Sequence, residues 1–284
     1  LLGFLNEKGI GAPLSPEHAF QIYLTAAQNG DIYGQSLVGQ CYQLGQGTPQ
    51  NIYQAIQWLH KAAKAGLPNA QYLLAFCFFD PQNEFQSYGY AFSFLEQAAK
   101  RGKREAQNWL GFFYLQGLGT KQRLKLSHYW FMKSALAGDR DGQLGLARFY
   151  RIILRDNRTS FSWLVRAAQG NNPNAHFFLG TYYYYGRGTV RNLRKAFYWI
   201  SKAISASGQQ RQKDKQQCQD YRDGLYLRSS ALEFLGMSYE RGQQAPRDVH
   251  KAVMIYRRAI AASGGVEGHR SMLNLCRIFR NDWY

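Results

Sequence analysis

The chain has 284 residues, of which 45% are apolar and 15% aromatic, a composition that supports a sizeable core and excludes an intrinsically disordered protein. No window approaches 18 uninterrupted apolar residues, so we do not expect a membrane-spanning helix. The net charge of +17 is uneven, because residues 1–99 carry −3 and residues 100–284 carry +20. Such a field attracts acidic proteins, anionic lipids, anionic glycans and nucleic acid alike.

The first residues lack the charged, apolar and small-residue order of a signal peptide. Leu1-Leu2-Gly3 falls inside the first copy of a pattern that recurs along the chain. We therefore expect residues upstream of Leu1 to be missing, together with any targeting signal.

The recurring pattern is a leucine or valine, then a small residue, then an aromatic residue three positions later. A second series of large apolar residues precedes alanine-rich segments such as "LHKAAKAG". Both series step by 36 residues, except for one step of 33 and one of 56. The pattern therefore predicts a repeat array with a three-residue deletion in the fifth repeat and a twenty-residue insertion after the sixth. The small residues are Gly3, Gly39, Ala75, Gly111, Ala147, Gly180 and Gly236; the large apolar residues are Ile22, Trp58, Phe94, Trp130, Trp163, Trp199 and Ile255.

Each repeat contains two helical patterns separated by a turn such as "YQLGQGT" or "YYYGRGT", in which glycine permits the positive φ that ends many helices. Neither helix can bury its apolar face alone, so successive pairs must stack into a solenoid. A polar insertion over 209–228 and a C-terminal capping helix over 265–284 complete the predicted organisation. The predicted repeats lie near 1–30, 31–66, 67–102, 103–138, 139–171, 172–208 and 229–264.

The order Ala-x-x-x-x-Gly, Leu-Gly-x-x-Tyr, Gly-x-Gly, Lys-Ala-x-x-Trp and Ala-Ala-x-x-Gly resembles the Sel1-like repeat, a relative of the tetratricopeptide repeat. The resemblance covers nearly the whole chain, although the third repeat has "DPQNEFQSYGY" in place of the glycine turn and the fifth lacks that turn. It implies an all-α, right-handed α-solenoid of about seven helix-turn-helix repeats. It also implies an adaptor in bacterial envelopes and signalling, in host–pathogen contact, or in endoplasmic-reticulum and chitin-synthesis complexes. A bacterial envelope, periplasmic or secreted location is favoured by this resemblance, with the cytoplasm as an alternative.

Positions that repeat along the chain are interpreted as packing positions. When the repeats are aligned, each aligned position forms a column. Tyr183 falls in a column of aromatic residues and is predicted to pack between helices. Tyr182 falls in a mostly apolar column that is predicted to be core. The turn Gly186-Arg187-Gly188 shares its place with turns that hold Gln or Leu centrally, so it is not a phosphate cradle. His176 replaces a glutamine column and is interpreted as a surface or groove residue.

Catalytic and metal-binding patterns are missing from the sequence. The four cysteines form neither a CxxC pair nor a zinc spacing with the six histidines, and no Ser–His–acid order or carboxylate pair stands out. We therefore expect no enzyme activity, cofactor or metal. Cys41 and Cys77 occupy equivalent points of neighbouring repeats, about 8–10 Å apart, so we expect two free, buried thiols.

Function is expected where the repeats differ, because packing positions recur and ligand positions need not. Residues three before, one after and four after the small residue share one face of each first helix. By resemblance to tetratricopeptide-like arrays, this face lines a concave groove. The predicted partner-binding residues are Tyr72, Phe76, Phe79, Asn108, Phe112, Leu115, Arg148, Arg151, Phe177 and Tyr184.

The fifth repeat contains "LARFYRIILRDNR", whose arginines recur at steps of three, four and three and would share one side of a continuous helix. One interpretation is a solvated basic face, and the other is an anion-binding ridge, because guanidinium groups pair with carboxylate or phosphate. Beyond the groove residues, the possible anion contacts are Arg155, Arg158, Arg187 and Arg191.

Two functional hypotheses follow. The first is a scaffold that holds a protein or peptide partner, favoured to be acidic, in the groove. The alternative is direct binding of a polyanion, with Tyr184 and Tyr185 available for stacking. Polyanion binding should weaken steeply with salt, whereas aromatic burial should not. The 209–228 insertion is interpreted as an exposed loop, or alternatively as a contact site.

Overall fold

The computed structural model describes residues 15–192, 194–196, 198–203, 232–242, 246–262 and 274, and within these ranges the regular structure is helical, without a strand. The chain divides into two compact halves, Leu1–Gly142 and Gln143–Tyr284, each of which is described by itself. The predicted insertion lies outside the described residues, as does the predicted capping helix apart from residue 274.

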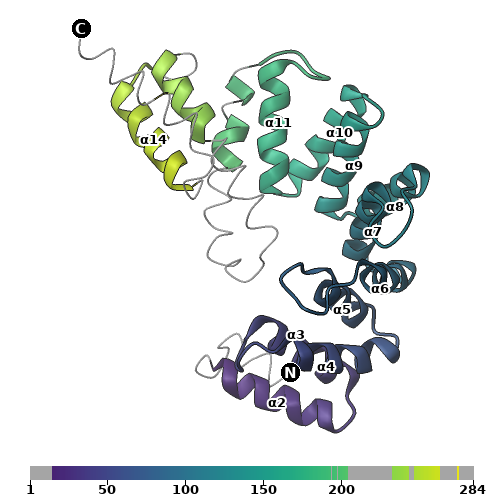
Figure 1. Cartoon of the computed structure of the whole chain (residues 1–284). Coiled ribbons are helices and arrows are strands. Elements are labelled where there is room, and N and C mark those ends of the chain that lie inside the picture. The colour runs from purple at the N-terminus through teal and green to yellow at the C-terminus, as the bar shows by residue number, and fades with distance from the viewer. Residues whose placement is uncertain are drawn as a thin grey trace. The chain divides into compact units, whose positions relative to one another are not determined.

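The N-terminal half is built from helices that pack against their neighbours in chain order, as Figure 1 shows. From the second to the fourth repeat, the first and second helices form an antiparallel pair, and each of these pairs contacts the next. The helices are α2 (Pro16–Gln28), α3 (Ile32–Leu44), α4 (Ile52–Lys64), α5 (Pro68–Phe79), α6 (Tyr88–Lys100), α7 (Arg104–Gln116) and α8 (Leu124–Leu136).

The C-terminal half continues the same arrangement. Helix α9 (Arg140–Ile152) is followed by α10 (Asn157–Gln169) and α11 (Pro173–Tyr185), with α10 packed on α11. Residues 194–196, 198–203 and 232–241 are helical, and α14 (Val249–Ala262) ends the part that can be described.

The helix boundaries follow from local sequence. Side-chain oxygens cap several first turns, as where Asp31 accepts a hydrogen bond from the Gly34 amide at 2.7 Å. Helices α3, α7 and α11 end at Gly45, Gly117 and Gly186, each with a positive φ, the conformation that favours glycine. The glycine-rich turns therefore stop helices, as the sequence predicts.

One backbone hydrogen bond closes the turn of each described repeat from the second to the seventh. The amide at the start of the second helix donates to the carbonyl of the aromatic residue near the end of the first helix, for example from Asn51 to Tyr42 at 2.8 Å. The third repeat keeps this spacing, from Ser87 to Phe78, without the glycine motif. In the fifth repeat the bond runs from Asp156 to Tyr150, so the three-residue deletion shortens this turn.

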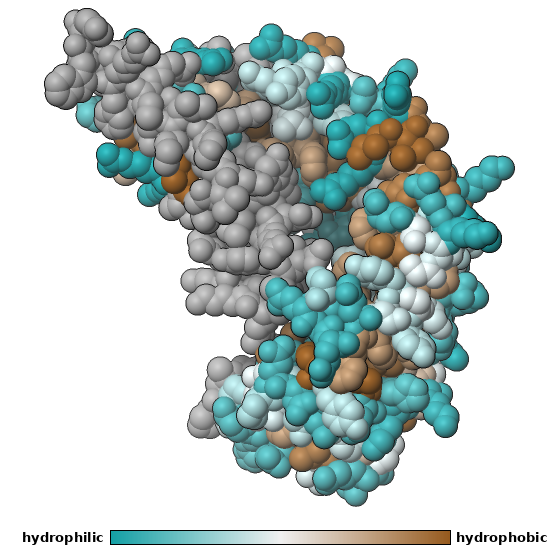
Figure 2. Space-filling view, viewed as in Figure 1, coloured by the Kyte–Doolittle hydropathy of each residue, from teal (hydrophilic) through white to brown (hydrophobic). Residues whose placement is uncertain are grey.

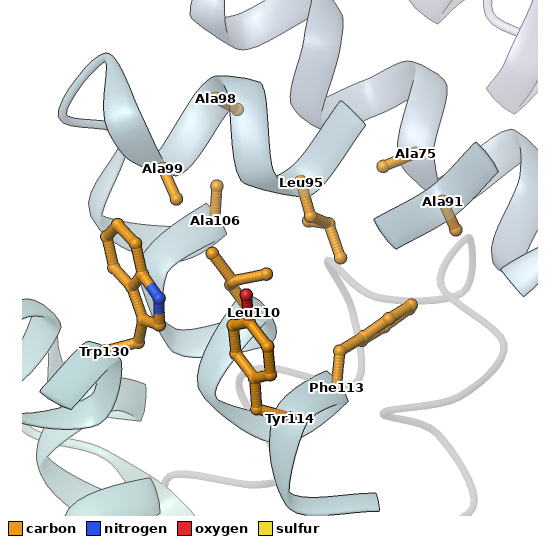
Figure 3. Close-up of a cluster of buried hydrophobic side chains, with 10 residues drawn as sticks. All are labelled: Ala75, Ala91, Leu95, Ala98, Ala99, Ala106, Leu110, Phe113, Tyr114 and Trp130. Atoms are coloured by element: carbon orange, nitrogen blue, oxygen red, sulfur yellow. The ribbon is translucent and has the colours of Figure 1, made fainter. Parts of the chain in front are cut away.

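The recurring small residue lies where the two helices of a repeat cross. A Cβ atom at Gly111 would be 2.9 Å from the Phe131 ring, and one at Gly39 would be 2.6 Å from Leu59 Cγ. The surrounding core is rich in alanine and leucine, so the helix backbones approach closely. Figure 3 shows one such cluster, formed by Ala75, Ala91, Leu95, Ala98, Ala99, Ala106, Leu110, Phe113, Tyr114 and Trp130 from α5 to α8.

Aromatic pairs join successive repeats. Tyr183 of α11 packs edge-on against Phe161 of α10, with ring centroids 5.4 Å apart. Tyr42 and Tyr114 make the same contact, at 5.3 Å, with the preceding repeat's Phe20 and Phe92. The predicted packing role of the Tyr183 column is confirmed. Tyr182 is 1% exposed, which confirms its prediction as core.

The second glycine of the Gly-x-Gly turn also joins successive repeats. A Cβ atom at Gly47, Gly119 or Gly188 would overlap the carbonyl oxygen that begins the previous repeat's second helix, at Pro16, Tyr88 or Asn157 respectively. The motif therefore allows close contact between the backbones of successive repeats, a role of the second glycine that the sequence analysis did not predict.

Cys41 and Cys77 are buried thiols that are not joined in a disulfide, as predicted. Burial, with a smaller contribution from the negative charge of Asp80, raises the pKa of the Cys77 thiol to about 12. Since the thiolate is the reactive form, Cys77 is a packing residue and a poor nucleophile.

His176 is fully buried, so its interpretation as a surface or groove residue is wrong. Its Nε2 donates to the Ala168 carbonyl at 3.0 Å, just as Gln71 and Gln107 donate to Ala63 and Ala99 at 3.2 and 3.1 Å. An imidazole N–H and an amide N–H can make the same bond. Burial lowers the pKa of His176, against the opposing effect of its bond to Ala168.

Replacing His176 with glutamine should remove one component of the protein's pH dependence. The buried imidazole resists a proton that the unfolded chain accepts, so its contribution to stability is fully present above the unfolded pKa, near 6.5, and is lost as the pH falls through its lower folded pKa. Urea unfolding near pH 7.5 and pH 5 should show a smaller loss for His176→Gln than for the parent protein. The control His250→Gln makes the same replacement at an exposed position. Equal losses in all three proteins would contradict this role.

Candidate interaction surfaces

The N-terminal half carries five aromatic side chains in mutual contact, which we call the aromatic face. Phe76 lies 4.9 Å from Tyr72 and 5.0 Å from Trp109, between ring centroids. Trp109 lies 5.4 Å from Phe79 and 5.7 Å from Phe112. All five are half-buried, so each keeps part of its surface in contact with solvent.

Helices α5 and α7 position the aromatic face as the first helices of neighbouring repeats. Tyr72, Phe76 and Phe79 recur at helical spacing on α5, and Phe112 takes the corresponding position on α7. The structure thus brings together four residues predicted for the groove. It adds Trp109, which the sequence interpretation missed because its column holds Leu37, Leu73 and Phe178 and reads as packing.

A basic group borders the aromatic face. Lys103 Nζ lies 5.4 Å from the Tyr72 ring centroid and 3.4 Å from Glu105 Oε2. Asn108 and Leu115, the other predicted groove residues of α7, are half-buried. The aromatic face therefore has polar and charged neighbours, an arrangement that is common around protein contact sites. On the side of the molecule shown in Figure 2, brown apolar areas lie among teal polar ones.

The predicted groove residues of the C-terminal half make separate contacts. The Arg148 guanidinium of α9 lies over the Phe178 ring of α11 at 4.9 Å. On α11, Phe177 lies 5.7 Å from Phe178, and Tyr184 lies 4.9 Å from Phe234 in the seventh repeat. These side chains are half-buried, as is Arg151.

The prediction of a continuous arginine ridge in the fifth repeat is wrong. Helix α9 ends at Ile152, and Arg155 has φ of 55°, outside a right-handed helix. Asp156 then caps α10 by accepting from the Arg158 and Thr159 amides, both at 3.0 Å. A strong N-cap residue starts a new helix here, so Arg155 lies in the turn before α10 and Arg158 in the first turn of α10, and neither lies on the helix that carries Arg148.

This turn lies beside the one that follows α11. Gly188 has no room for a Cβ atom against the Asn157 carbonyl, and the Arg158 amide nitrogen would be 3.0 Å from that position. Exposed arginines therefore come from both turns at one edge of the C-terminal half. We call them the arginine cluster: Arg155, Arg158, Arg187 and Arg191.

Two arginines of the cluster stack on tyrosines. The Arg187 guanidinium lies 4.8 Å from the Tyr185 ring centroid, and that of Arg191 lies 5.8 Å from the Tyr184 centroid. Tyr185 is 61% exposed. Tyr184 and Tyr185, whose roles the repeat comparison leaves open, therefore support arginines.

The buried hydroxyl of Tyr182 is influenced by the positive charges of nearby arginines. It shares a 2.7 Å hydrogen bond with Ser160 Oγ. Burial raises the pKa of Tyr182, while the bond to Ser160 and the charges of Arg151 and Arg187 act in the opposite direction. The phenol stays protonated at neutral pH and serves as a packing and hydrogen-bonding group.

Among the residues that the structure describes, no three His, Cys, Asp or Glu side chains are grouped to hold a metal ion. Within the same residues, every helix is too short or too polar to span a bilayer.

The fold and these surfaces define an α-solenoid of helix-turn-helix repeats with candidate interaction surfaces. The chain belongs to the Sel1 repeat family, and the predicted all-α repeat fold is confirmed. Sel1 repeats typically mediate protein–protein interaction and are generally non-catalytic. The family profile matches residues 1–31, 32–67, 68–103, 104–139, 141–172, 173–207 and 229–263.

Two solved structures share the fold. The c5321 protective antigen of uropathogenic Escherichia coli, with an SLR fold, has a TM-score of 0.79 and 23% identity, over 95% of this chain and 54% of that one. A Sel1 repeat protein from Oxalobacter formigenes has a TM-score of 0.72 and 27% identity, over 96% of this chain and 74% of that one.

A short segment resembles a curated protein, the chitin synthase regulator SKT5 of Saccharomyces cerevisiae. The two are 41% identical over 49 residues, which is 17% of this chain and 7% of that protein. This chain thus matches a small part of SKT5 and about half of c5321.

Proposed function

We propose that the chain is a non-enzymatic scaffold that binds a protein or peptide partner on the exposed faces of its first helices. The observation that carries this proposal is the aromatic face. A packing role alone would repeat along the chain, but the columns of Phe76 and Phe112 hold Gln40 and Thr181 in other repeats. Clustered, partly exposed aromatic rings are preferred anchors in protein interfaces.

The charge of the chain favours an acidic partner. Residues 100–284 carry the whole positive excess, which would speed association with a negatively charged protein. A partner that combines an apolar segment with acidic residues fits both the aromatic face and the basic C-terminal half.

Direct binding of a polyanion is the alternative function. The high positive charge favours it, but the aromatic face lies in the half with fewer basic residues. A partner held there by burial of apolar surface should lose little affinity when salt is added. The affinity of a polyanion complex should instead fall linearly with salt on logarithmic scales, because the release of counterions is less favourable at high salt.

Replacing Trp109 or Phe112 with alanine should each weaken partner binding by about 1–3 kcal/mol, because each truncation removes an anchor of the aromatic face. The partner is first isolated by affinity capture with the intact chain, and its affinity for each variant is then measured by calorimetry at two salt concentrations. Arg151→Ala, in the other half, tests the second predicted contact region in the same way.

Tyr33→Ala is the matched control, since Tyr33 is an aromatic residue of α3 that is 63% exposed and lies off the aromatic face. It should leave affinity unchanged. Circular dichroism should show native helicity in every variant. Unchanged affinity in folded Trp109→Ala and Phe112→Ala would refute binding at this face.

A further inference from the structure

The segment from the fifth to the sixth repeat is almost free of negative charge. Residues 143–203 contain ten lysines and arginines and a single acid, Asp156. That carboxylate is engaged as the N-cap of α10, and a hydrogen bond from the Thr159 side chain, followed by those from the Thr159 and Arg158 amides, lowers its pKa. Within this segment, basic side chains therefore outnumber carboxylates by ten to one.

The arginine cluster concentrates this charge at one edge. The turn that carries Arg187 and Arg191 packs its Gly188 backbone onto the start of α10, directly beside Arg158. Arg155 precedes the cap by one residue. The four exposed guanidinium groups belong to the start of α10, the turn before it and the turn after α11 that touches it, and like charges carried on adjoining segments favour an anion.

Stacking prepares two of the guanidinium groups for binding. A guanidinium that packs over a ring keeps N–H groups available and loses less side-chain entropy when it pairs with an oxyanion. Arg187 over Tyr185 and Arg191 over Tyr184 have this arrangement. The same stacking covers one face of each tyrosine, and Tyr184 also contacts Phe234 edge-on, which leaves these rings poorly placed to stack on nucleic-acid bases.

We propose that the arginine cluster is a docking site for an acidic, Asp- and Glu-rich segment of the protein partner. This inference rests on the proposed scaffold function for the nature of its occupant. Carboxylates spaced along an extended peptide can pair with several guanidinium forks in turn. The cluster belongs to the C-terminal half and the aromatic face to the N-terminal half, and the cluster residues lie on turns and at the start of the second helix α10 instead of on a first helix.

The test uses a fluorescent peptide of about ten residues that alternates glutamate with serine, and a matched peptide with glutamine for glutamate. Fluorescence anisotropy should show binding of the glutamate peptide alone. The double variant Arg158→Ala/Arg187→Ala should weaken binding by about tenfold or more, because each lost guanidinium–carboxylate pair is worth a few-fold or more. Both positions are exposed, so native helicity is expected.

The matched control is Arg166→Ala/Arg258→Ala, which removes the same charge from exposed positions of α10 and α14 outside the cluster. It should weaken binding by no more than about threefold. The double variant Arg158→Lys/Arg187→Lys keeps the charge but not the fork, and should fall between the parent and the alanine variant. Since lysine keeps the side-chain bulk and charge, this variant guards against a folding defect.

Three outcomes would overturn the proposal: equal losses in the cluster and control variants, equal binding of both peptides, or no binding of the glutamate peptide. Tighter binding of a single-stranded oligonucleotide of equal charge, with loss in the cluster variant, would assign the cluster to nucleic acid and also overturn it. Trp109→Ala is scored against the captured partner and not against this peptide. A failed arginine site and a failed aromatic face therefore give different results.

Discussion

Replacing Tyr182 with alanine should lower the free energy of unfolding by about 3–5 kcal/mol, because the change empties a large buried volume that the rigid helix stack cannot fill. The ring is 1% exposed and lies parallel to Phe161 across the boundary between two repeats. Its hydroxyl completes a buried chain in which Ser160 Oγ donates to the Ala147 carbonyl at 2.7 Å. The loss is measured by urea unfolding, followed by circular dichroism.

Two controls separate the parts of this effect. Tyr182→Phe keeps the ring and removes the hydroxyl, so it should cost about 1 kcal/mol. Tyr185→Ala removes an exposed tyrosine three residues away, and should change stability by no more than about 0.5 kcal/mol. A cost for Tyr182→Ala no greater than that for Tyr185→Ala would show that the Tyr182 column does not hold the repeats together.

The helix pairs and their packing could be predicted because the repeats of this one chain can be aligned with each other. A residue type that recurs at one position in several repeats meets the same neighbours each time, as Tyr42, Tyr114 and Tyr183 do. The small residues at Gly39 and Gly111 recur for the same reason, since each faces a large side chain of its own second helix. Contacts that recur in each repeat therefore appear in the sequence as residue types that recur at a fixed spacing.

The misinterpreted positions show what such a comparison lacks. His176 differs in residue type from the glutamines at the equivalent position but makes the same hydrogen bond, so the different residue type does not indicate a different role. Trp109 has the opposite problem, because its column reads as packing while its ring belongs to the aromatic face. Residue type alone does not report whether a side chain is the buried or the exposed member of an apolar group.

The arginine ridge failed for a local reason. Helical spacing of Arg148, Arg151 and Arg155 favours one helix, but Asp156 offers a side-chain cap to the amides that follow it. The cap and the shortened turn outweigh the spacing. The closeness of Arg158 to the turn after α11 depends on contact between successive repeats, which no single repeat contains.

Replacing Gly119 with alanine should destabilise the protein by about 2–5 kcal/mol, because the change combines a backbone strain with a steric overlap. Gly119 has φ of 61°, which costs a residue with a Cβ atom about 1–2 kcal/mol. Its Cβ atom would also overlap the Tyr88 carbonyl at the start of α6, and forcing the two backbones apart adds about 1–3 kcal/mol.

Comparison with Gly138→Ala isolates the contribution of the steric overlap. Gly138 has φ of 81°, with no other atom within 4 Å of the position that a Cβ would take. The two variants share the conformational cost, so the difference between their unfolding free energies measures how tightly the glycine turn holds one repeat against the one before it. Gly188→Ala should repeat the larger loss in the other half, where the overlap is with the Asn157 carbonyl. Equal losses for Gly119→Ala and Gly138→Ala would mean that the Gly-x-Gly turn only ends the helix, and that the contact between repeats depends on the aromatic pairs alone.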